Sequence, residues 1–228
     1  MSRYYQGKHA HGYNIRWLRF NTRTLSETLA MIDITALRNV QEMHRRSPRV
    51  LDLACGTGLL LKQVLTQVPD VEAYGLDASA DMLAQARFAL KDQPHVYLER
   101  IKIGYGMPLN LPYEHFDLIT CTNALHDMPD VVALLAGLGK LLVPGGQLVL
   151  EDFAPHRPRI FWTVFEWLLQ QIEGNKVHAY TLQEAILLCE QAGLHVDREK
   201  VFTIDWLWQG WVLSAYRTTM ITIPSQYD

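Results

Sequence analysis

The sequence predicts an α/β fold built on a doubly wound, mostly parallel sheet, and two observations carry this prediction. From about residue 49 to 153, short apolar runs alternate with segments of helical periodicity, the pattern of parallel strands joined by crossover helices. The first run ends in a glycine turn that opens a helix. The second ends in Asp77, which stands about 20 positions after Gly56, the spacing at which an acidic side chain meets a ribose.

Helical structure is expected before the sheet, within residues 1–48. Thr24 and Glu27 have the spacing of a capping box, and the apolar residues that follow recur at roughly helical intervals. We expect this helix to pack one face on the main domain, and the arm before it to fold over the pocket. His9 and His11 form an isolated pair with no further ligands at suitable spacing, so no metal site is expected.

Five apolar runs are expected to be the parallel strands. They are residues 50–54, 71–77, 96–103, 116–122 and 147–153. Between them, Ser79 is expected to cap one helix. Pro129 and Asp130 open another, which stops before Pro144.

The last third of the chain is expected to add a lid and to close the sheet. Residues 157–178 carry aromatic side chains on more than one helical face, which indicates an inserted helical lid. Thr181 and Glu184 are expected to cap a helix that ends near Gly193. Closing strands are expected at residues 194–196 with 202–206 and at 211–216. The predicted organisation is an N-terminal helical arm (1–48), a main domain (49–220) and a tail (221–228).

Composition limits the classes of function. The chain has 228 residues, 49% of them hydrophobic, which suits one α/β domain with a small appendage. The net charge is −3 and no long basic run occurs, so no nucleic-acid partner is expected. Three widely separated cysteines suit a reducing cytoplasm. No apolar run of about 18 residues occurs, so no membrane span is expected.

The glycine turn suits a cationic nucleoside better than a dinucleotide. Leu61 replaces the third glycine of a dinucleotide-binding turn. Asp52 places a carboxylate just before the turn, where it would repel phosphate and attract a cation. Gly56 and Gly58 allow the main chain to approach a ligand that a Cβ atom would obstruct.

The run Asp52-Leu53-Ala54-Cys55-Gly56-Thr57-Gly58 resembles the first motif of class I S-adenosylmethionine-dependent methyltransferases. The run Thr122-Asn123-Ala124-Leu125-His126-Asp127-Met128-Pro129 is similar to a stretch of ubiquinone-biosynthesis-like and other small-molecule methyltransferases. The resemblance covers about residues 49 to 216. It implies a Rossmann-like, seven-stranded sheet whose last strand is antiparallel.

The resemblance also implies S-adenosyl-L-methionine as cofactor, S-adenosyl-L-homocysteine as product and a small, apolar or aromatic acceptor. It implies that Asp52 helps to orient the amino group of the cofactor, and Asp77 is expected at its ribose. The alternatives are that Asp52 only ties down the loop and that Asp77 is a charge at a helix N-terminus. The residues expected to bind the cofactor are Tyr13, Asp52, Ala54, Gly56, Gly58, Asp77, Ala78, Met82, Met107, Asn123 and Ala124.

One motif departs from the family pattern. Gly106, Met107 and Pro108 stand where the family has Gly-Asp-Ala, so Met107 replaces the aspartate that accepts from the adenine amino group. Pro108 has no backbone N–H to donate. Adenine is therefore expected to be held by apolar packing and by neighbouring polar groups such as Asn110.

Two histidines are candidate general bases, because an imidazole titrates close to working pH. His126 follows the fourth strand and His156 follows the fifth. For His126 the alternatives are a residue that lines the cofactor pocket or one that caps the next helix, and for His156 a surface histidine. Cys55 is expected to be filler inside the turn.

Other classes of protein stay open. One is a non-catalytic module that binds S-adenosylmethionine or S-adenosylhomocysteine without turnover. Another is an RNA or protein methyltransferase, which predicts a cationic groove that the charge balance does not support. A nicotinamide oxidoreductase is third. A monomer or a homodimer is expected.

Overall fold

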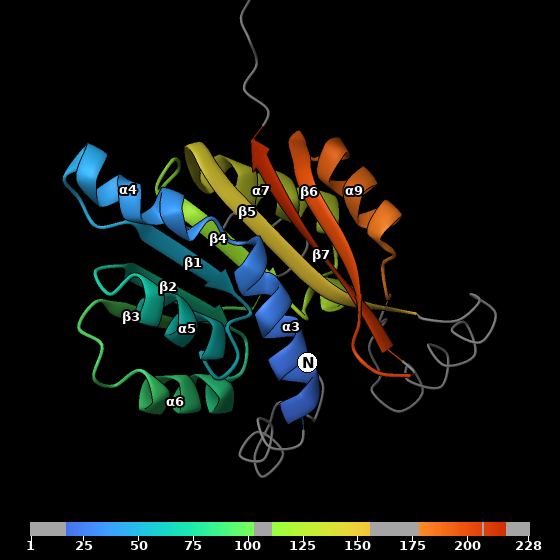
Figure 1. Ribbon diagram of the computed structural model, residues 1–228, viewed down its shortest axis with the longest axis horizontal. Coiled ribbons are helices and arrows are strands. Elements are labelled where there is room, and N and C mark those ends of the chain that lie inside the picture. The colour runs from blue at the N-terminus through green and yellow to red at the C-terminus, as the bar shows by residue number, and fades with distance from the viewer. Residues whose placement is uncertain (1–16, 103–110, 156–177, 207, 218–228) are drawn as a thin grey trace, which may run out of the picture.

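A seven-stranded sheet forms the centre of the protein (Figure 1). The computed structural model describes residues 17–102, 111–155, 178–206 and 208–217. The strands are β1 (Arg49–Leu53), β2 (Glu72–Asp77), β3 (Val96–Arg100), β4 (Phe116–Thr122), β5 (Leu142–Pro155), β6 (Leu194–Thr203) and β7 (Trp208–Arg217). Their order is β3-β2-β1-β4-β5-β7-β6, with β1 to β5 parallel and β7 antiparallel to both β5 and β6. The predicted fold class is confirmed.

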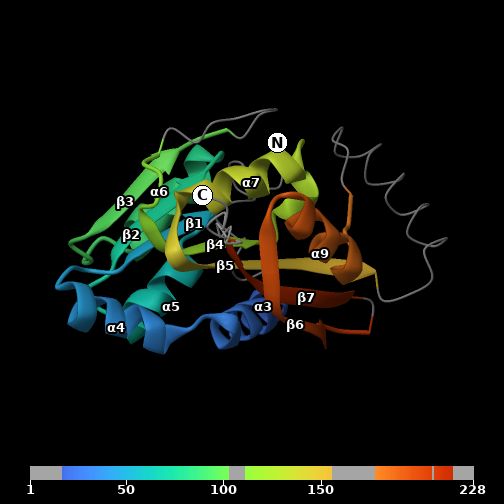
Figure 2. The same ribbon diagram turned by 90° about the horizontal axis from the view of Figure 1, so that it is seen from above.

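Helices cover both faces of the sheet (Figure 2). One face carries α3 (Leu18–Met31), α4 (Ile34–His44) and α5 (Leu59–Gln67), and the other carries α7 (Val131–Leu141) and α9 (Leu182–Gln191). Helix α6 (Ala80–Ala89) packs on β2 and β3, and a short 3-10 helix, η2 (Leu125–Asp127), follows β4.

Each face has its own hydrophobic core, because side chains alternate along a strand. On β1, Leu51 and Leu53 enter the core under α7 and α9, whereas Val50 enters the core under α3 and α5. On β5, Leu150 belongs to the first core and Val149 to the second. This alternation also decides which polar side chains of β5 face α3.

Three predicted helix starts are confirmed. The Ser79 hydroxyl accepts from the backbone N–H of Met82 at 3.2 Å, and Asp130 accepts from that of Ala133 at 3.0 Å. At α9, Thr181 and Glu184 form both bonds of a capping box. Local side-chain to backbone bonds of this kind depend only on nearby residues, which is why the sequence reveals them.

The predicted capping box at Thr24 and Glu27 is wrong. Helix α3 begins at Leu18, so Thr24 lies inside it, and the Thr24 hydroxyl donates to the main-chain oxygen of Phe20 at 3.2 Å. Glu27 pairs instead with Arg23 at 2.8 Å and Lys200 at 2.5 Å. Residues three apart share a helix face anywhere along a helix, so the spacing alone does not mark a start.

Helix α3 packs against β5 and β7, as expected for a helical segment that covers the main domain. A second helix, α4, follows it within the segment that was expected to be helical. The arm before residue 17, most of the expected lid at 157–178 and the tail lie outside the described residues. No described helix is long and apolar enough to cross a membrane.

Candidate cofactor site

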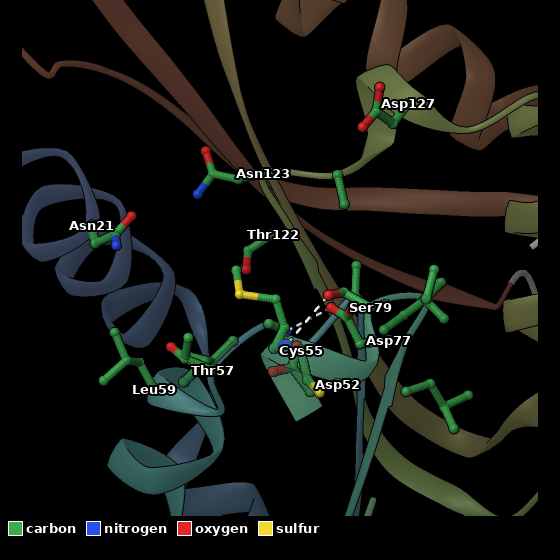
Figure 3. Close-up of a pocket in the computed structure, with 18 of the residues that line it drawn as sticks. Asn21, Asp52, Cys55, Thr57, Leu59, Asp77, Ser79, Thr122, Asn123 and Asp127 are labelled. Atoms are coloured by element: carbon green, nitrogen blue, oxygen red, sulfur yellow. Dashed lines mark hydrogen bonds between the residues drawn. The ribbon is translucent and has the colours of Figure 1, made fainter. Parts of the chain in front are cut away.

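A cavity of about 240 Å³ lies at the carboxyl ends of β1, β2 and β4, on the side covered by α3 (Figure 3). Open α/β sheets bind ligands outside the carboxyl ends of their strands, where the strand order reverses. Here the order reverses between β1 and β4. The cavity therefore lies where the fold favours a ligand.

Most of the predicted cofactor residues meet around this cavity. They are Asp52, Ala54, Gly56, Asp77, Ala78, Met82, Asn123 and Ala124. Gly58 is not among the described residues that line it. Tyr13 and Met107 lie outside the described residues.

Gly58 contributes to the turn through its backbone. It caps α5 with a φ of +76°, and an added Cβ would lie 2.9 Å from Leu90 Cδ1 and 3.2 Å from Ala86 Cβ. Both the left-handed backbone and the close approach to α6 thus require glycine. Glycine is therefore needed at position 58 for packing beside the cavity.

Strained backbone conformations occur at two strand ends that face the cavity. Ala54 follows β1 with a φ of +60°, and Asn123 follows β4 with a φ of +49°. Side-chain-bearing residues seldom adopt this conformation, and it persists where the surrounding structure imposes it, often at binding sites. Both residues line the cavity.

Asp77 fixes the glycine turn to the start of α6. One of its carboxylate oxygens accepts from the Gly56 N–H at 2.8 Å and the other from the Ser79 N–H at 2.7 Å. Burial raises the pKa of Asp77, and these backbone N–H groups act in the opposite direction. A carboxylate has about four lone-pair sites, so Asp77 keeps capacity for a ligand hydroxyl.

Asp52 lies deeper in the site. It is 1% exposed, and its carboxyl accepts a hydrogen bond from the Thr120 hydroxyl on β4 at 2.7 Å. Burial raises the pKa of Asp52 to about 7, although the Thr120 hydroxyl lowers it. The loop-tying role that the sequence offered for Asp52 is performed by Asp77. A cation that enters the cavity would favour the charged form of Asp52.

Helix α3 supplies a wall that sequence reasoning missed. Asn21, Thr24 and Thr28 line the cavity, and Asn123 Nδ2 donates to the Thr24 hydroxyl at 3.4 Å. Figure 3 shows the Asn21 side chain on α3 and that of Asn123 at the end of β4 on neighbouring sides of the cavity. The sequence signal that could have revealed this wall is the recurrence of Asn21, Thr24 and Thr28 at helical spacing. Other lining residues that the sequence did not indicate are Ser79, Lys102, Asp127 and Met128.

His126 pairs with a buried carboxylate on β5. Its Nδ1 lies 2.9 Å from Asp152 Oδ1, and its backbone N–H donates to Asp152 Oδ2 at 3.0 Å. A carboxylate in this position fixes the tautomer and orientation of an imidazole. Asp130 caps the following helix, so the helix-cap alternative for His126 is wrong. His126 is not among the described residues that line the cavity, and His156 lies outside the described residues.

The cysteines suit a structural role. Cys55, Cys121 and Cys189 are free and buried, and burial raises the pKa of each thiol. A reactive cysteine needs the opposite shift toward thiolate. Cys55 therefore fills space inside the turn, as expected.

The fold and this site together define a class of protein. A sheet of five parallel strands closed by antiparallel β7, with a cavity beside the glycine turn after β1 and acids on β1 and β2, has the architecture of the class I methyltransferase type.

Comparison with known proteins agrees. A family model described as a methyltransferase domain matches residues 51–148. A demethylmenaquinone methyltransferase of Deinococcus radiodurans is 34% identical over 158 residues, 64% of this chain and 64% of that protein. The match thus spans slightly less than two thirds of that relative. The chain is thus similar to class I S-adenosylmethionine-dependent methyltransferases in both sequence and fold.

Two solved structures share the fold. An S-adenosylmethionine-dependent methyltransferase from Mesorhizobium loti matches with a TM-score of 0.64 and 23% identity, over 84% of this chain and 96% of that one. A phosphoethanolamine N-methyltransferase of Haemonchus contortus, in complex with S-adenosylhomocysteine, matches with a TM-score of 0.66 and 13% identity, over 85% of this chain and 53% of that one.

Proposed function

We propose that the protein transfers a methyl group from S-adenosylmethionine to a small, apolar or aromatic acceptor by in-line displacement. The observation that carries this proposal is the cavity beside the glycine turn, where Asp52 and Asp77 face a space enclosed by α3. The similarity to methyltransferases supports the cofactor. The relative from Deinococcus radiodurans is named for demethylmenaquinone, which supports a small-molecule acceptor.

The residues around the cavity fit this cofactor. Buried carboxyls suit a cationic ligand. The turn at Gly56 leaves room for a close backbone approach, since a Cβ there would meet only Met82 Cε, at 3.9 Å, among the described residues. We assign Asp52 to the amino group, Asp77 to the ribose and Met82 to apolar contact. Ala54, Gly56, Ala78, Asn123 and Ala124 complete the described contacts. Tyr13, Gly58 and Met107 keep their predicted roles as proposals.

The chain contributes alignment and exclusion of water. When bound, the cofactor supplies an electrophilic methyl group on a positively charged sulfur. Holding two reactants in line can lower a barrier by roughly 7 to 11 kcal/mol, so no catalytic triad is required. Helix α3 covers one side. The N-terminal arm before residue 17 and the lid predicted at 157–178, which lie almost wholly outside the described residues, remain proposals for excluding water from the rest of the site.

We propose His126 as the general base for an acceptor that must lose a proton, with Asp152 as its positioning residue. The 2.9 Å contact between the His126 ring and Asp152 supports this assignment. His156 is the second candidate. We further propose a cytoplasmic protein, supported by its three free cysteines, that acts as a monomer or homodimer and binds no nucleic acid.

Calorimetry with S-adenosylmethionine and S-adenosylhomocysteine tests the cofactor. Binding of both is expected, and absence of both would overturn the proposal. Turnover with labelled cofactor against a panel of phenols, amines and quinols then tests the acceptor. Cofactor binding without turnover of any compound would favour a non-catalytic module, and salt-sensitive RNA binding would favour an RNA methyltransferase.

A further inference from the structure

Glu151, on β5, is a buried carboxyl without a hydrogen-bond partner in the described part of the chain. It is 0% exposed, and neither of its carboxyl oxygens has a hydrogen-bond partner among the described residues. Asn123 Oδ1 is buried and unpartnered in the same way. More than nine in ten buried polar groups are satisfied in native proteins, and an orphaned group is costly. Two orphaned groups therefore call for an explanation.

The two groups are neighbours on one face of the sheet. The Asn123 backbone N–H donates to the Glu151 main-chain oxygen at 2.9 Å. Glu151 pairs with Val212 and follows Val149 by two positions, and both valines belong to the core under α3. The Asn123 amide group points the same way, since its Nδ2 contacts Thr24 of α3. Glu151 and Asn123 thus lie together beneath α3.

An aromatic surface continues from Glu151 along the same face. Phe153 is two residues further on β5, and its ring centroid lies 6.4 Å from that of Phe20 and 5.2 Å from that of Trp208. Phe20 in turn lies 5.7 Å from Trp17. Asn123 lines the cofactor cavity, so it joins this aromatic surface to the cofactor site.

The orphaned groups suit a ligand group that both donates and accepts, and a hydroxyl is the smallest such group. Burial, and then the charge of Asp152, raises the pKa of Glu151, which favours a neutral carboxyl with one O–H donor. The Asn123 amide oxygen only accepts. A ligand hydroxyl can donate to Asn123 and accept from Glu151 at once. A carbonyl would leave Asn123 unsatisfied, and an ammonium would require ionised Glu151.

We propose that Glu151 and Asn123 bind a hydroxyl group of an aromatic methyl acceptor and so determine acceptor specificity. This inference rests on the proposed function and adds the residues that select the acceptor. The hydroxyl sits between the two side chains, and the ring packs against the surface formed by Phe20, Phe153 and Trp208.

Ligand binding tests the inference. Protein saturated with S-adenosylhomocysteine is titrated with 1-naphthol and with naphthalene, which lacks the hydroxyl. Wild type is expected to prefer 1-naphthol by about tenfold or more, and Glu151→Met to lose that preference while its S-adenosylhomocysteine affinity is unchanged. Equal binding of the two compounds by wild type, or an unchanged preference in Glu151→Met, would overturn the inference and leave the cofactor site standing. Failure of S-adenosylhomocysteine to bind would instead overturn the proposed function.

Stability separates a binding role from a structural one. Glu151→Met removes an unsatisfied carboxyl, so its melting temperature is expected to equal or exceed that of wild type. Gln147 is the matched control on the same strand and face, because its Nε2 donates to Met31 O at 3.0 Å and to Ser214 Oγ at 2.8 Å. Gln147→Met is expected to melt about 4 °C lower or more. A similar loss in Glu151→Met would contradict the inference.

Discussion

The cofactor half of the site, at the ends of β1 and β2, and the proposed acceptor half, at Glu151 on β5, differ in how their buried carboxyls are hydrogen-bonded. At the ends of β1 and β2, Asp77 accepts from two backbone N–H groups and Asp52 from the Thr120 hydroxyl. At the end of β5, Glu151 has no such partner among the described residues. The first half is held in place by the protein itself. In the proposed acceptor half, the Glu151 carboxyl is left free to bind a ligand group.

This difference follows from what each half is proposed to bind. The cofactor is the same in every turnover, so its half gains from carboxyls that are already held in position. The acceptor half must discriminate between similar molecules, and buried groups left unpaired by the wrong ligand do so strongly. Substitutions in either half should therefore remove or accentuate this difference.

The largest effect is expected at His126, the proposed general base. His126→Ala should lower turnover about 100-fold or more, because a positioned base is lost, while S-adenosylhomocysteine affinity stays within about twofold. The measurement is the pH dependence of turnover with an acceptor from the panel, and the limb due to the base should disappear. His115→Ala, at the opposite end of β4, serves as the control. Lost cofactor affinity in His126→Ala would show that His126 belongs to the cofactor wall.

The next effect concerns Asp52 and pH. Because the folded pKa is raised to about 7 from 3.8, the unfolded chain releases this proton first as the pH rises. Stability of the cofactor-free protein should therefore fall between about pH 4 and 7, by at most about 4 kcal/mol from this group. Asp52→Asn should lack this part of the pH dependence. Chemical unfolding across that range measures it, and identical pH profiles for the two proteins would refute the effect.

A smaller effect is expected at the turn. Gly58→Ala should cost about 2 to 4 kcal/mol of stability, since it adds a strained φ to a collision with Leu90. Gly145 is the matched control, with a φ of +79° and no described atom within 4 Å of an added Cβ. Gly145→Ala should cost about 1 kcal/mol. Equal losses in urea unfolding would show that packing against α6 is unimportant.

The sequence predicted what depends on nearby residues. The apolar runs gave the strands, Ser79 and Thr181 marked helix starts, and the glycine turn with Asp77 located the cavity. These features arise from strand burial, capping and turn geometry, each of which is encoded within a few residues.

The features that the sequence did not predict are contacts between distant segments. Asp152 meets His126 from 26 positions away, and Thr24 meets Asn123 from 99 positions away. Thr24 was assigned to a helix start because its spacing from Glu27 is that of a capping box, and two residues three apart show the same local pattern anywhere along a helix. The orphaned state of Glu151 depends on three strands and α3 packing together, which no local pattern records.

The most direct measurement compares the two halves by calorimetry with S-adenosylhomocysteine. Asp77→Asn should weaken the affinity for S-adenosylhomocysteine about tenfold or more. The amide nitrogen would face one of the two backbone N–H groups that now donate to the carboxylate, and the charged acceptor for the ribose would be lost. Asp81→Asn, in the first turn of α6, is the control for a lost surface charge. Glu151→Met should bind S-adenosylhomocysteine as wild type does. Unchanged affinity in Asp77→Asn, or an equal loss in Glu151→Met, would contradict the division of the site into a cofactor half and an acceptor half.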